Sequence, residues 1–251
     1  MSCPDSGSDD NVISLQLVQS LGIPFTSDER NQKRFSLANG KVIHSIGTAM
    51  ARCNFAHGTP ARDPFDVFFY VFETLAAPVI IGMMFLQATE TFSQYRDRLE
   101  EIVVSQSQVF RIQGIDTPMR DLLCLLGDDL VFANADSGSD LDLMSAEYAT
   151  RRGFRILPSR ETIMFADGSV DTTSGVVRLP FSIEELDSIE MSSMQDSPEG
   201  ELEFHVYDKL VHNVLIGHGT IEARQIFIRT VCQWYQNHTS RNYRTSMSSV
   251  I

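Results

Sequence analysis

DSGSD occupies residues 5–9 of this chain and recurs at residues 136–140, which is 131 positions later (136 minus 5). Further short matches follow this pair in the same order along both halves of the sequence. They are Ser14 with Ser145, Gly22 with Gly153, ANG (38–40) with ADG (166–168), FYVFETL (69–75) with FHVYDKL (204–210), and IIG (80–82) with LIG (215–217). Matches kept in order, with small insertions and deletions between them, indicate an internal duplication.

Both copies carry the signals of one short helix. Ser14 and Ser145 each follow an apolar pair, and serine is a favoured N-cap because its hydroxyl accepts a hydrogen bond from the first turn. Gly22 and Gly153 stand where that helix would end. Glycine adopts the left-handed conformation that closes many helices. We therefore expect one short helix in each copy, between the serine and the glycine.

The rest of each copy has the pattern of β-structure. Residues 65–72 and 201–207 are rich in aromatic and β-branched side chains, which favours strands. The Asn-Gly pair at 39–40 and the Asp-Gly pair at 167–168 predict tight two-residue hairpins, in which both central residues have positive φ. The sequence therefore predicts an all-β fold in which helices are few and short.

The duplication divides the chain into four parts. We expect a first lobe over residues 1–105, a linker over 106–121, a second lobe over 122–236 and a flexible tail over 237–251. Apolar runs on both sides of residues 127–129 predict a hairpin that leads the chain into the second DSGSD sequence.

The first DSGSD sequence has only four residues ahead of Asp5. A typical strand contains about five or six residues. Pro4 would also withhold an N–H group from any ladder at that position. We therefore expect the N-terminal strand of the first lobe to be missing.

Charge and cysteine content limit the partners. Lys plus Arg number 20 and Asp plus Glu number 33 among 251 residues, a formal net charge of −13. This chain lacks the cationic surplus that binds a nucleic-acid backbone or an anionic membrane, so neither partner is expected. The four cysteines are isolated, the six histidines lack metal-ligand spacing, and the sequence shows no signal peptide or membrane-spanning run. We expect an intracellular, cytoplasmic protein that needs no metal or organic cofactor.

The stretch DSGSDDNVI at residues 5–13, the hairpin after it and the closing IIG or LIG resemble the retropepsin-like aspartic peptidases. These are the single-lobe relatives of pepsin found in retroviruses and retrotransposons. The resemblance covers roughly residues 1–99 and 122–228. It implies two tandem β-barrel lobes of the acid-protease type, each with a short helix, arranged as a pepsin-like pseudo-dimer.

The resemblance also implies a site. Asp5 and Asp136 would meet across a pseudo-two-fold axis and share one proton, because two like charges so close cannot both ionise. Together they would activate a water molecule for peptide-bond hydrolysis. A separation beyond about 8 Å, well outside hydrogen-bond range, would exclude this pair. The supporting residues implied are Ser6 and Ser137 across the lobe boundary, Gly7 and Gly138 at the close approach, Gly82 and Gly217 behind the loops, and Asn39, Gly40, Asp167 and Gly168 in a substrate-covering flap.

Two functions remain open at this point. The first is an aspartic endopeptidase, a hydrolase acting on a polypeptide substrate, with its pair of aspartates formed within one chain or between the equal lobes of a homodimer. The second is a catalytically inactive, domesticated retropepsin fold that acts as an interaction or scaffold module. Active members of the family often carry Asp or Asn after the closing glycine, whereas residues 83–84 are MM and residues 218–219 are HG. Fold alone does not decide between these functions.

Overall fold

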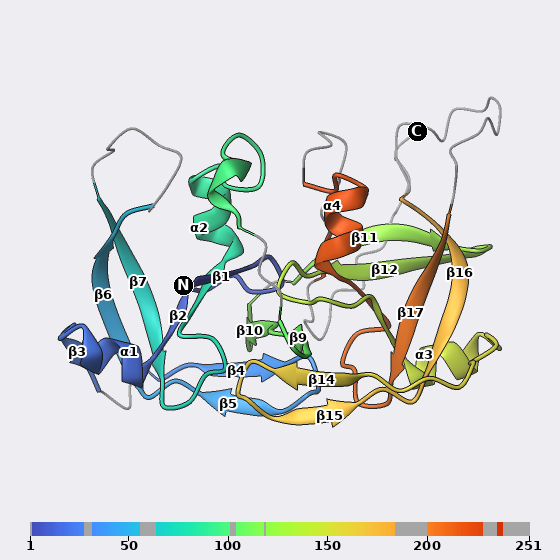
Figure 1. The fold of residues 1–251 in the computed structure, drawn as a ribbon, viewed down its shortest axis with the longest axis horizontal. Helices are drawn as coiled ribbons and strands as arrows, with labels where there is room; N and C mark the ends of the chain where they lie inside the picture. The colour runs from blue at the N-terminus through green and yellow to red at the C-terminus, as the bar shows by residue number, and fades with distance from the viewer. Residues whose placement is uncertain are drawn as a thin grey trace, which may run out of the picture.

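The structure, a computed structural model, describes residues 2–27, 32–55, 64–100, 104–117, 119–183, 200–227 and 235–237. Their regular secondary structure is mostly β-strand, with short helices between the strands. Figure 1 shows two lobes side by side, the first coloured from blue to teal and the second from yellow-green to red. The predicted all-β class with short helices is confirmed. Within the described ranges, no helix is long and apolar enough to cross a membrane.

A similar succession of elements occurs twice. The first lobe contains β1 (Ser2–Asp5), β2 (Val12–Ser14), α1 (Leu15–Ser20), β3 (Phe25–Thr26), β4 (Arg34–Leu37), β5 (Val42–His44), β6 (Gly47–Cys53), β7 (Phe65–Phe72), β8 (Val79–Gly82), α2 (Met83–Ala88) and the 3₁₀ helix η2 (Arg96–Arg98). Two short strands, β9 (Ser107–Val109) and β10 (Ile112–Gly114), follow between the lobes. The second lobe contains β11 (Met119–Leu126), β12 (Asp129–Ala135), β13 (Leu143–Ser145), α3 (Ala146–Arg151), β14 (Thr162–Phe165), β15 (Val170–Thr172), β16 (Gly175–Ile183), β17 (Glu201–Tyr207), β18 (Val214–Ile216), α4 (His218–Ala223) and β19 (Tyr235–Asn237).

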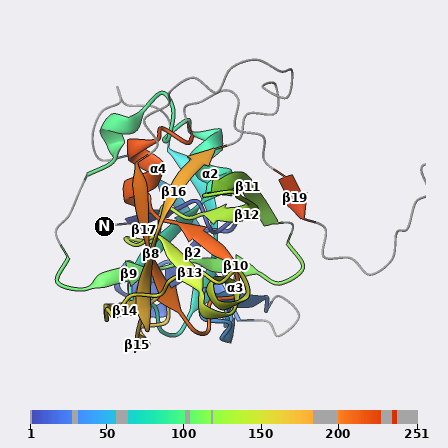
Figure 2. The ribbon, with the colours of Figure 1, turned by 90° about the vertical axis from the view of Figure 1, so that its right-hand side faces the viewer.

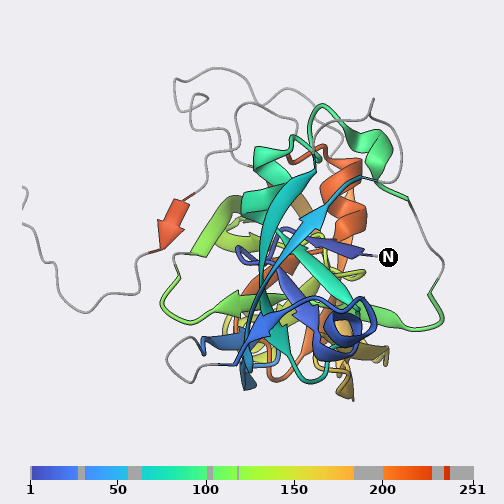
Figure 3. The ribbon, with the colours of Figure 1, turned by 90° about the vertical axis from the view of Figure 1, so that its left-hand side faces the viewer.

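The main sheets of the two lobes differ in closure. The first has six strands in the order β1-β8-β2-β7-β6-β3, with β1 at one edge. The second has the order β12-β18-β13-β17-β16-β11-β19, and β11 also pairs with β12, so six of its strands close into a barrel. The first lobe is thus an open half-barrel and the second a closed barrel. Figure 2 shows the second lobe from its own side, with α4 above and the β14–β15 hairpin below, and Figure 3 shows the first lobe from the opposite side.

The strand before Asp5, which was expected to be missing, is present. β1 pairs in parallel with β8, from Ser2 opposite Val79 to Asp5 opposite Gly82. Pro4 is tolerated because β1 is an edge strand, so its absent N–H interrupts no second ladder. Among the described residues, β11 and β19 have no counterpart in the sheet of the first lobe.

The two hairpins have a different turn from the expected one. In the β4–β5 hairpin, Gly40 N donates to Leu37 O at 3.0 Å, and Gly40 has a φ of 78°. In the β14–β15 hairpin, Gly168 N donates to Phe165 O at 2.9 Å, and Gly168 has a φ of 81°. The residue before each glycine keeps a negative φ. The prediction of two positive φ values was wrong because these are three-residue loops, a type I turn followed by a left-handed glycine.

Other local predictions can be compared directly with the structure. β7 and β17 span the predicted ranges. The hydroxyl of Ser14 accepts from Leu17 N at 3.3 Å at the start of α1, and Ser145 caps α3 in the same way, so both caps are confirmed. The segment expected to be a linker, residues 106–121, contains β9, β10 and the first residues of β11. The expected tail lies outside the described residues from position 238 onward.

One hydrophobic cluster joins both lobes. It includes Val12, Phe35, Leu37, Phe72 and Ile80 from the first lobe, Val109, Phe110 and Ile112 from the segment between the lobes, and Leu143, Ile163, Phe165, Tyr207 and Leu215 from the second. Each lobe also has a cluster of its own. Because burial of apolar surface is the main force that stabilises folded proteins, this shared cluster holds the two lobes against each other.

Candidate active site

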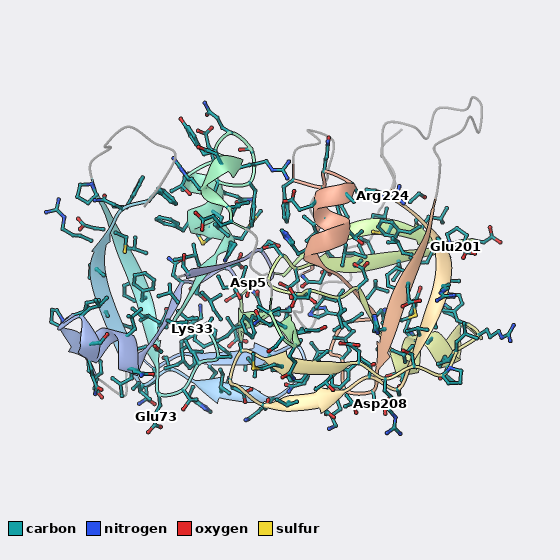
Figure 4. The ribbon with its side chains drawn as sticks, viewed as in Figure 1. Asp5, Lys33, Glu73, Glu201, Asp208 and Arg224 are labelled. Carbon is teal, nitrogen blue, oxygen red and sulfur yellow. The ribbon has the colours of Figure 1, made fainter. Side chains whose placement is uncertain are left out.

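Both DSG sequences form tight loops at the boundary between the lobes. β1 leads the chain to Asp5 and β2 takes it away, while β12 and β13 do the same for Asp136. Both aspartates are fully buried. Figure 4 shows Asp5 at the centre of the molecule, between the lobes. The fold therefore brings together two acidic side chains that are 131 positions apart in the sequence.

Ser6 and Ser137 join the two loops through four hydrogen bonds. Ser6 N donates to Ser137 Oγ at 2.9 Å, and Ser137 N donates to Ser6 Oγ at 2.8 Å. Each hydroxyl then donates to the main chain of the opposite lobe, Ser6 Oγ to Ala135 O at 3.1 Å and Ser137 Oγ to Pro4 O at 3.2 Å. This exchange is symmetrical, so both loops are held in the same way.

The two carboxyls lie close to each other, between Gly7 and Gly138. A Cβ built on Gly7 would lie 2.8 Å from Oδ1 of Asp136 and 3.1 Å from Oδ1 of Asp5. These two Oδ1 atoms are therefore separated by at most about 5.9 Å, the sum of the two distances. A Cβ on Gly138 would lie 2.9 Å from Cγ of Asp5. Neither position has room for a side chain, and the carboxyls are within the limit set for a shared pair.

The surroundings favour a proton on this pair. Burial, the charge of Asp136 and hydrogen bonding between the two carboxyls raise the pKa of Asp5 well above its usual value. Burial also raises the pKa of Asp136. Its Oδ2 atom is buried and accepts no hydrogen bond from the N–H groups and hydroxyls of the described residues. Because two adjacent buried carboxylates repel each other, we expect the pair to hold one proton in common and to titrate as a unit.

The two aspartates differ in their remaining partners. Each Oδ1 accepts the N–H of the glycine two residues later, at 2.8 Å in the first lobe and 2.9 Å in the second. Asp5 Oδ2 also accepts from Ser8 Oγ at 2.5 Å. Ser139, the equivalent of Ser8, instead donates to Leu141 O at 2.7 Å. The sequence analysis did not single out Ser8, because identical serines in both copies gave no sign that only one contacts its aspartate.

Gly82 and Gly217 lie directly behind the loops. A Cβ on either glycine would lie within 2.6 Å of a main-chain oxygen of the loop in front of it. Their N–H groups donate to the side chains of Asn11 at 3.0 Å and Asp142 at 2.7 Å. The sequence analysis did not name these two side chains, although the offset of 131 positions relates them.

The tips of the two hairpins contain Asn39 and Gly40 in one lobe and Asp167 and Gly168 in the other. Each tip contacts the opposite lobe: Ala38 O accepts from Val211 N at 3.1 Å, and Ala166 O accepts from Ala76 N at 2.8 Å. Lys41 also forms an ion pair with Asp167 between the two tips. The hairpins are thus closed against each other.

Residues 107–114, named the strap below, run between the hairpins and the DSG loops (Figure 1). β9 pairs in parallel with β14, and β10 pairs antiparallel with β4. Gln108 N donates to Asp140 Oδ2 at 2.7 Å, next to the second DSG loop. The sequence analysis treated this segment as a connector, since nothing in its composition shows that it lies beside the aspartates.

The reactive groups at the centre of the site are two carboxyls, flanked by hydroxyls and main-chain amides. A carboxyl pair that holds one proton can act as base and acid at once, because one member is ionised while the other is protonated. No group of three or more His, Cys, Asp or Glu side chains able to hold a metal ion occurs in the part of the chain that the structure describes.

Comparisons with known proteins find likeness in structure but none in sequence. A scan of the sequence against protein-family models finds no match, and a search of curated proteins finds none either. The chain is similar to the crystal structure of the retroviral protease-like domain of Ddi1 from Leishmania major, with 17% sequence identity and a TM-score of 0.34, covering 50% of this chain and 100% of that chain. A likeness this distant carries no functional argument, so the proposal below rests on the geometry of the site.

Proposed function

We propose that the chain is a retropepsin-like aspartic endopeptidase in which two tandem lobes each supply one catalytic aspartate, Asp5 and Asp136. The observation that carries the proposal is the close approach of these two buried carboxyls, which come from equivalent loops of two lobes. The symmetrical hydrogen bonds between Ser6 and Ser137 support it, because they hold both loops in one fixed arrangement.

The proposed mechanism uses the shared proton. The ionised carboxyl accepts a proton from a water molecule as its oxygen attacks the carbonyl carbon of the substrate, and the protonated carboxyl donates to the carbonyl oxygen. The proton then passes to the leaving amine as the C–N bond breaks. The raised pKa of Asp5 keeps one proton on the pair under mildly acidic conditions.

A second candidate is a non-catalytic interaction module with the same fold. The observation that favours it is the complete burial of both aspartates beneath the strap, which leaves the pair closed to solvent. In that case the loops would serve only to join the lobes. Binding of a peptide without its hydrolysis would be the property that separates this candidate from the first.

Cleavage of a peptide library between about pH 4 and 7 tests the proposal. The chain is assayed with its natural strap and as the variant Gln108→Pro. Proline has no N–H group, so this variant loses the hydrogen bond from Gln108 N to the carboxylate of Asp140. We expect cleavage by at least one of these two chains. In that chain, Asp5→Asn and Asp136→Asn should each lower the rate by about 10²-fold or more, since each removes one half of the acid–base pair. Absence of cleavage by both folded chains would favour the interaction module.

A mixing experiment separates a pair within one chain from a pair between two chains. Equal amounts of Asp5→Asn and Asp136→Asn are unfolded together and refolded, alongside each variant refolded alone. If the pair forms within one chain, the mixture stays as inactive as its components. Recovery of a substantial part of the wild-type rate would show that the two aspartates come from different chains.

A further inference from the structure

The strap has the geometry of a bound peptide. It pairs in parallel with β14 of one hairpin and antiparallel with β4 of the other, and these two strands are equivalent by the duplication. The two lobes are related by a pseudo-two-fold axis, so β4 and β14 run in opposite directions. A single extended segment that crosses this axis is therefore parallel to one of these strands and antiparallel to the other. Extended peptides bind to other proteins by this kind of strand addition.

The opposite side of the strap is held by the DSG loops through its main chain. On the second lobe, Phe110 N donates to Gly138 O at 2.8 Å, and Asp140 N donates to Gln108 O at 2.8 Å. On the first lobe, Ile112 N donates to the hydroxyl of Ser8 at 3.0 Å. These contacts use main-chain groups of the strap, so any extended polypeptide could make them.

The centre of the strap lies between its contacts with the two lobes. The main-chain nitrogens of Phe110 and Ile112 are held by different lobes, and the atom midway between them along the chain is the nitrogen of Arg111. The peptide bond between Phe110 and Arg111 therefore lies between the contacts of the strap with the two DSG loops. One of these contacts is made by Ser8, whose hydroxyl also donates to Asp5.

The side chains of the strap are buried on both sides of this bond. Phe110 is 3% exposed and Ile112 is 0% exposed, and both belong to the hydrophobic cluster that joins the lobes. Arg111 is also buried, and its Nε donates to Asn134 Oδ1 at 3.1 Å. Its positive charge lowers the pKa of Asp5 and of Asp136, in opposition to burial. Arg111 thus works against the shared proton that hydrolysis requires.

We propose that the strap is an internal pseudo-substrate that fills the peptide channel of this chain and keeps it inhibited. We further propose that the channel accepts extended polypeptides with bulky apolar side chains at the positions of Phe110 and Ile112. The inference rests on the proposed peptidase function for its catalytic consequence, but occupation of the channel can be measured by binding alone.

The experiment compares the intact strap with an opened one. The opened variants are Gln108→Pro, which removes one main-chain donor, and the double variant Phe110→Asp/Ile112→Asp, which places charge in the apolar part of the channel. The matched control is Phe132→Asp, at a side chain that is 44% exposed on β12. All chains carry Asp136→Asn, so a bound peptide is not hydrolysed. The probe is a fluorescein-labelled peptide with the strap sequence SQVFRIQG.

We expect the opened chains to bind the labelled peptide at least tenfold more tightly than the intact and control chains. Equal affinity of folded intact and opened chains would overturn the proposal. Hydrogen exchange on the intact chain provides a measurement that needs no variant to fold. The amides of Phe110 and Ile112 are expected to exchange at least a hundredfold more slowly than in the free peptide, and unprotected amides would also overturn the proposal.

Cleavage assays on the same variants with Asp136 restored separate the two proposals. Opened chains that bind the peptide but hydrolyse nothing would support the strap and contradict the peptidase. An intact chain that hydrolyses a peptide library as fast as the opened chains would contradict the strap and support the peptidase. Opened chains that hydrolyse at least tenfold faster than the intact chain would support both.

Discussion

The second lobe closes its barrel with β11, which pairs with β12 and with β16, whereas the sheet of the first lobe ends at the four-residue strand β1. Despite this difference, Asp5 and Asp136 are equally buried. Each loop rests on a parallel pairing, β1 with β8 and β12 with β18. Each loop is also held by the opposite lobe through a serine. The geometry of the loops thus depends on these two supports and does not require a closed barrel.

The lobes differ in a second way, at the aspartates themselves. Ser8 donates to Asp5, whereas Ser139 donates to a main-chain oxygen of its own loop. Ser8 also accepts the N–H of Ile112 from the strap. A duplication that began with two equal loops has thus acquired different surroundings for its two acids. The comparison predicts that some substitutions have equal effects in both lobes and that others act in only one.

The largest effect is expected where the lobes are equivalent, at Gly7 and Gly138. Alanine at either position would place its Cβ less than 3.0 Å from Cγ of the aspartate in the opposite lobe, so the carboxyls must move apart. A displacement of about 1 Å can cost about 10²-fold in rate. We expect Gly7→Ala and Gly138→Ala to lower peptide cleavage by that factor, measured as kcat/KM in the Gln108→Pro background.

The matched control for these glycines is Gly219→Ala. Its Cβ would have no neighbour within 4 Å, and the residue lies in α4 with an ordinary φ. We expect unchanged cleavage for this variant. A loss at Gly7 that leaves Gly138→Ala fully active would show that the lobes do not contribute equally.

The serines that join the loops are expected to have equal effects on stability. Ser6→Ala and Ser137→Ala each remove a hydroxyl that donates one hydrogen bond and accepts another. Leaving an N–H group unsatisfied in a partly buried place costs about 1–3 kcal/mol. We expect each variant to lose this much free energy of unfolding in urea. Ser20→Ala, whose exposed hydroxyl donates to the carbonyl of Leu17, is the control and should lose far less.

Ser8 and Ser139 have different partners, so substitutions at these two serines are expected to have different effects on cleavage. Ser8 stabilises the ionised form of Asp5, so Ser8→Ala should raise the pKa of that carboxyl. A hydrogen bond to a charged group is worth about 1.5–3 kcal/mol, so the alkaline limb of the cleavage pH profile, where the pair loses its shared proton, should move upward by about one to two pH units. Ser139→Ala should leave that limb in place. Equal shifts in both variants would contradict the asymmetry seen in the structure.

The smallest effect concerns stability as a function of pH. Because burial raises the pKa of Asp136, its protonated form stabilises the folded state at low pH, and this contribution is lost as the pH rises through the folded-state pKa. Asp136→Asn removes the ionisable group. We expect the variant to melt about 2–4 °C above the wild type at pH 7, which corresponds to about 1 kcal/mol, and the difference to shrink towards pH 4. Asp66→Asn, at a carboxyl that is 70% exposed, is the matched control.

Much of the fold was predictable because its signals are local. The caps at Ser14 and Ser145 and the strands of β7 and β17 follow from residue type over a few positions. The helices α2 and α4 were not predicted, since each has six residues, begins after a glycine and has no side-chain cap. The turn type was missed because Asn-Gly and Asp-Gly pairs occur in both kinds of hairpin loop. In the two-residue loop both residues have positive φ, whereas in the three-residue loop found here only the glycine does.

The site was predictable only where the two copies repeat each other. The pairs Asp5 with Asp136 and Ser6 with Ser137 were named because the repeated DSG sequence resembles that of retropepsin-like peptidases. In the structure the carboxyl Oδ1 atoms lie at most about 5.9 Å apart, and the two serines are joined by hydrogen bonds. The strap was missed because its position depends on contacts with residues far away in the sequence. Its sequence SQVFRIQG has no counterpart in a second copy that could have drawn attention to it.

The central claim is that two lobes of one chain bring two aspartates into a single pair that shares a proton. A ¹³C NMR titration of the aspartate carboxyls tests it directly and needs no catalytic activity. In the wild-type chain we expect Asp5 to titrate well above its usual pKa, and in Asp136→Asn we expect that pKa to fall, because the neighbouring charge is gone while burial remains. If Asp5 titrates at its usual pKa, or at the same pKa in both chains, the two carboxyls do not form a pair and the account is contradicted.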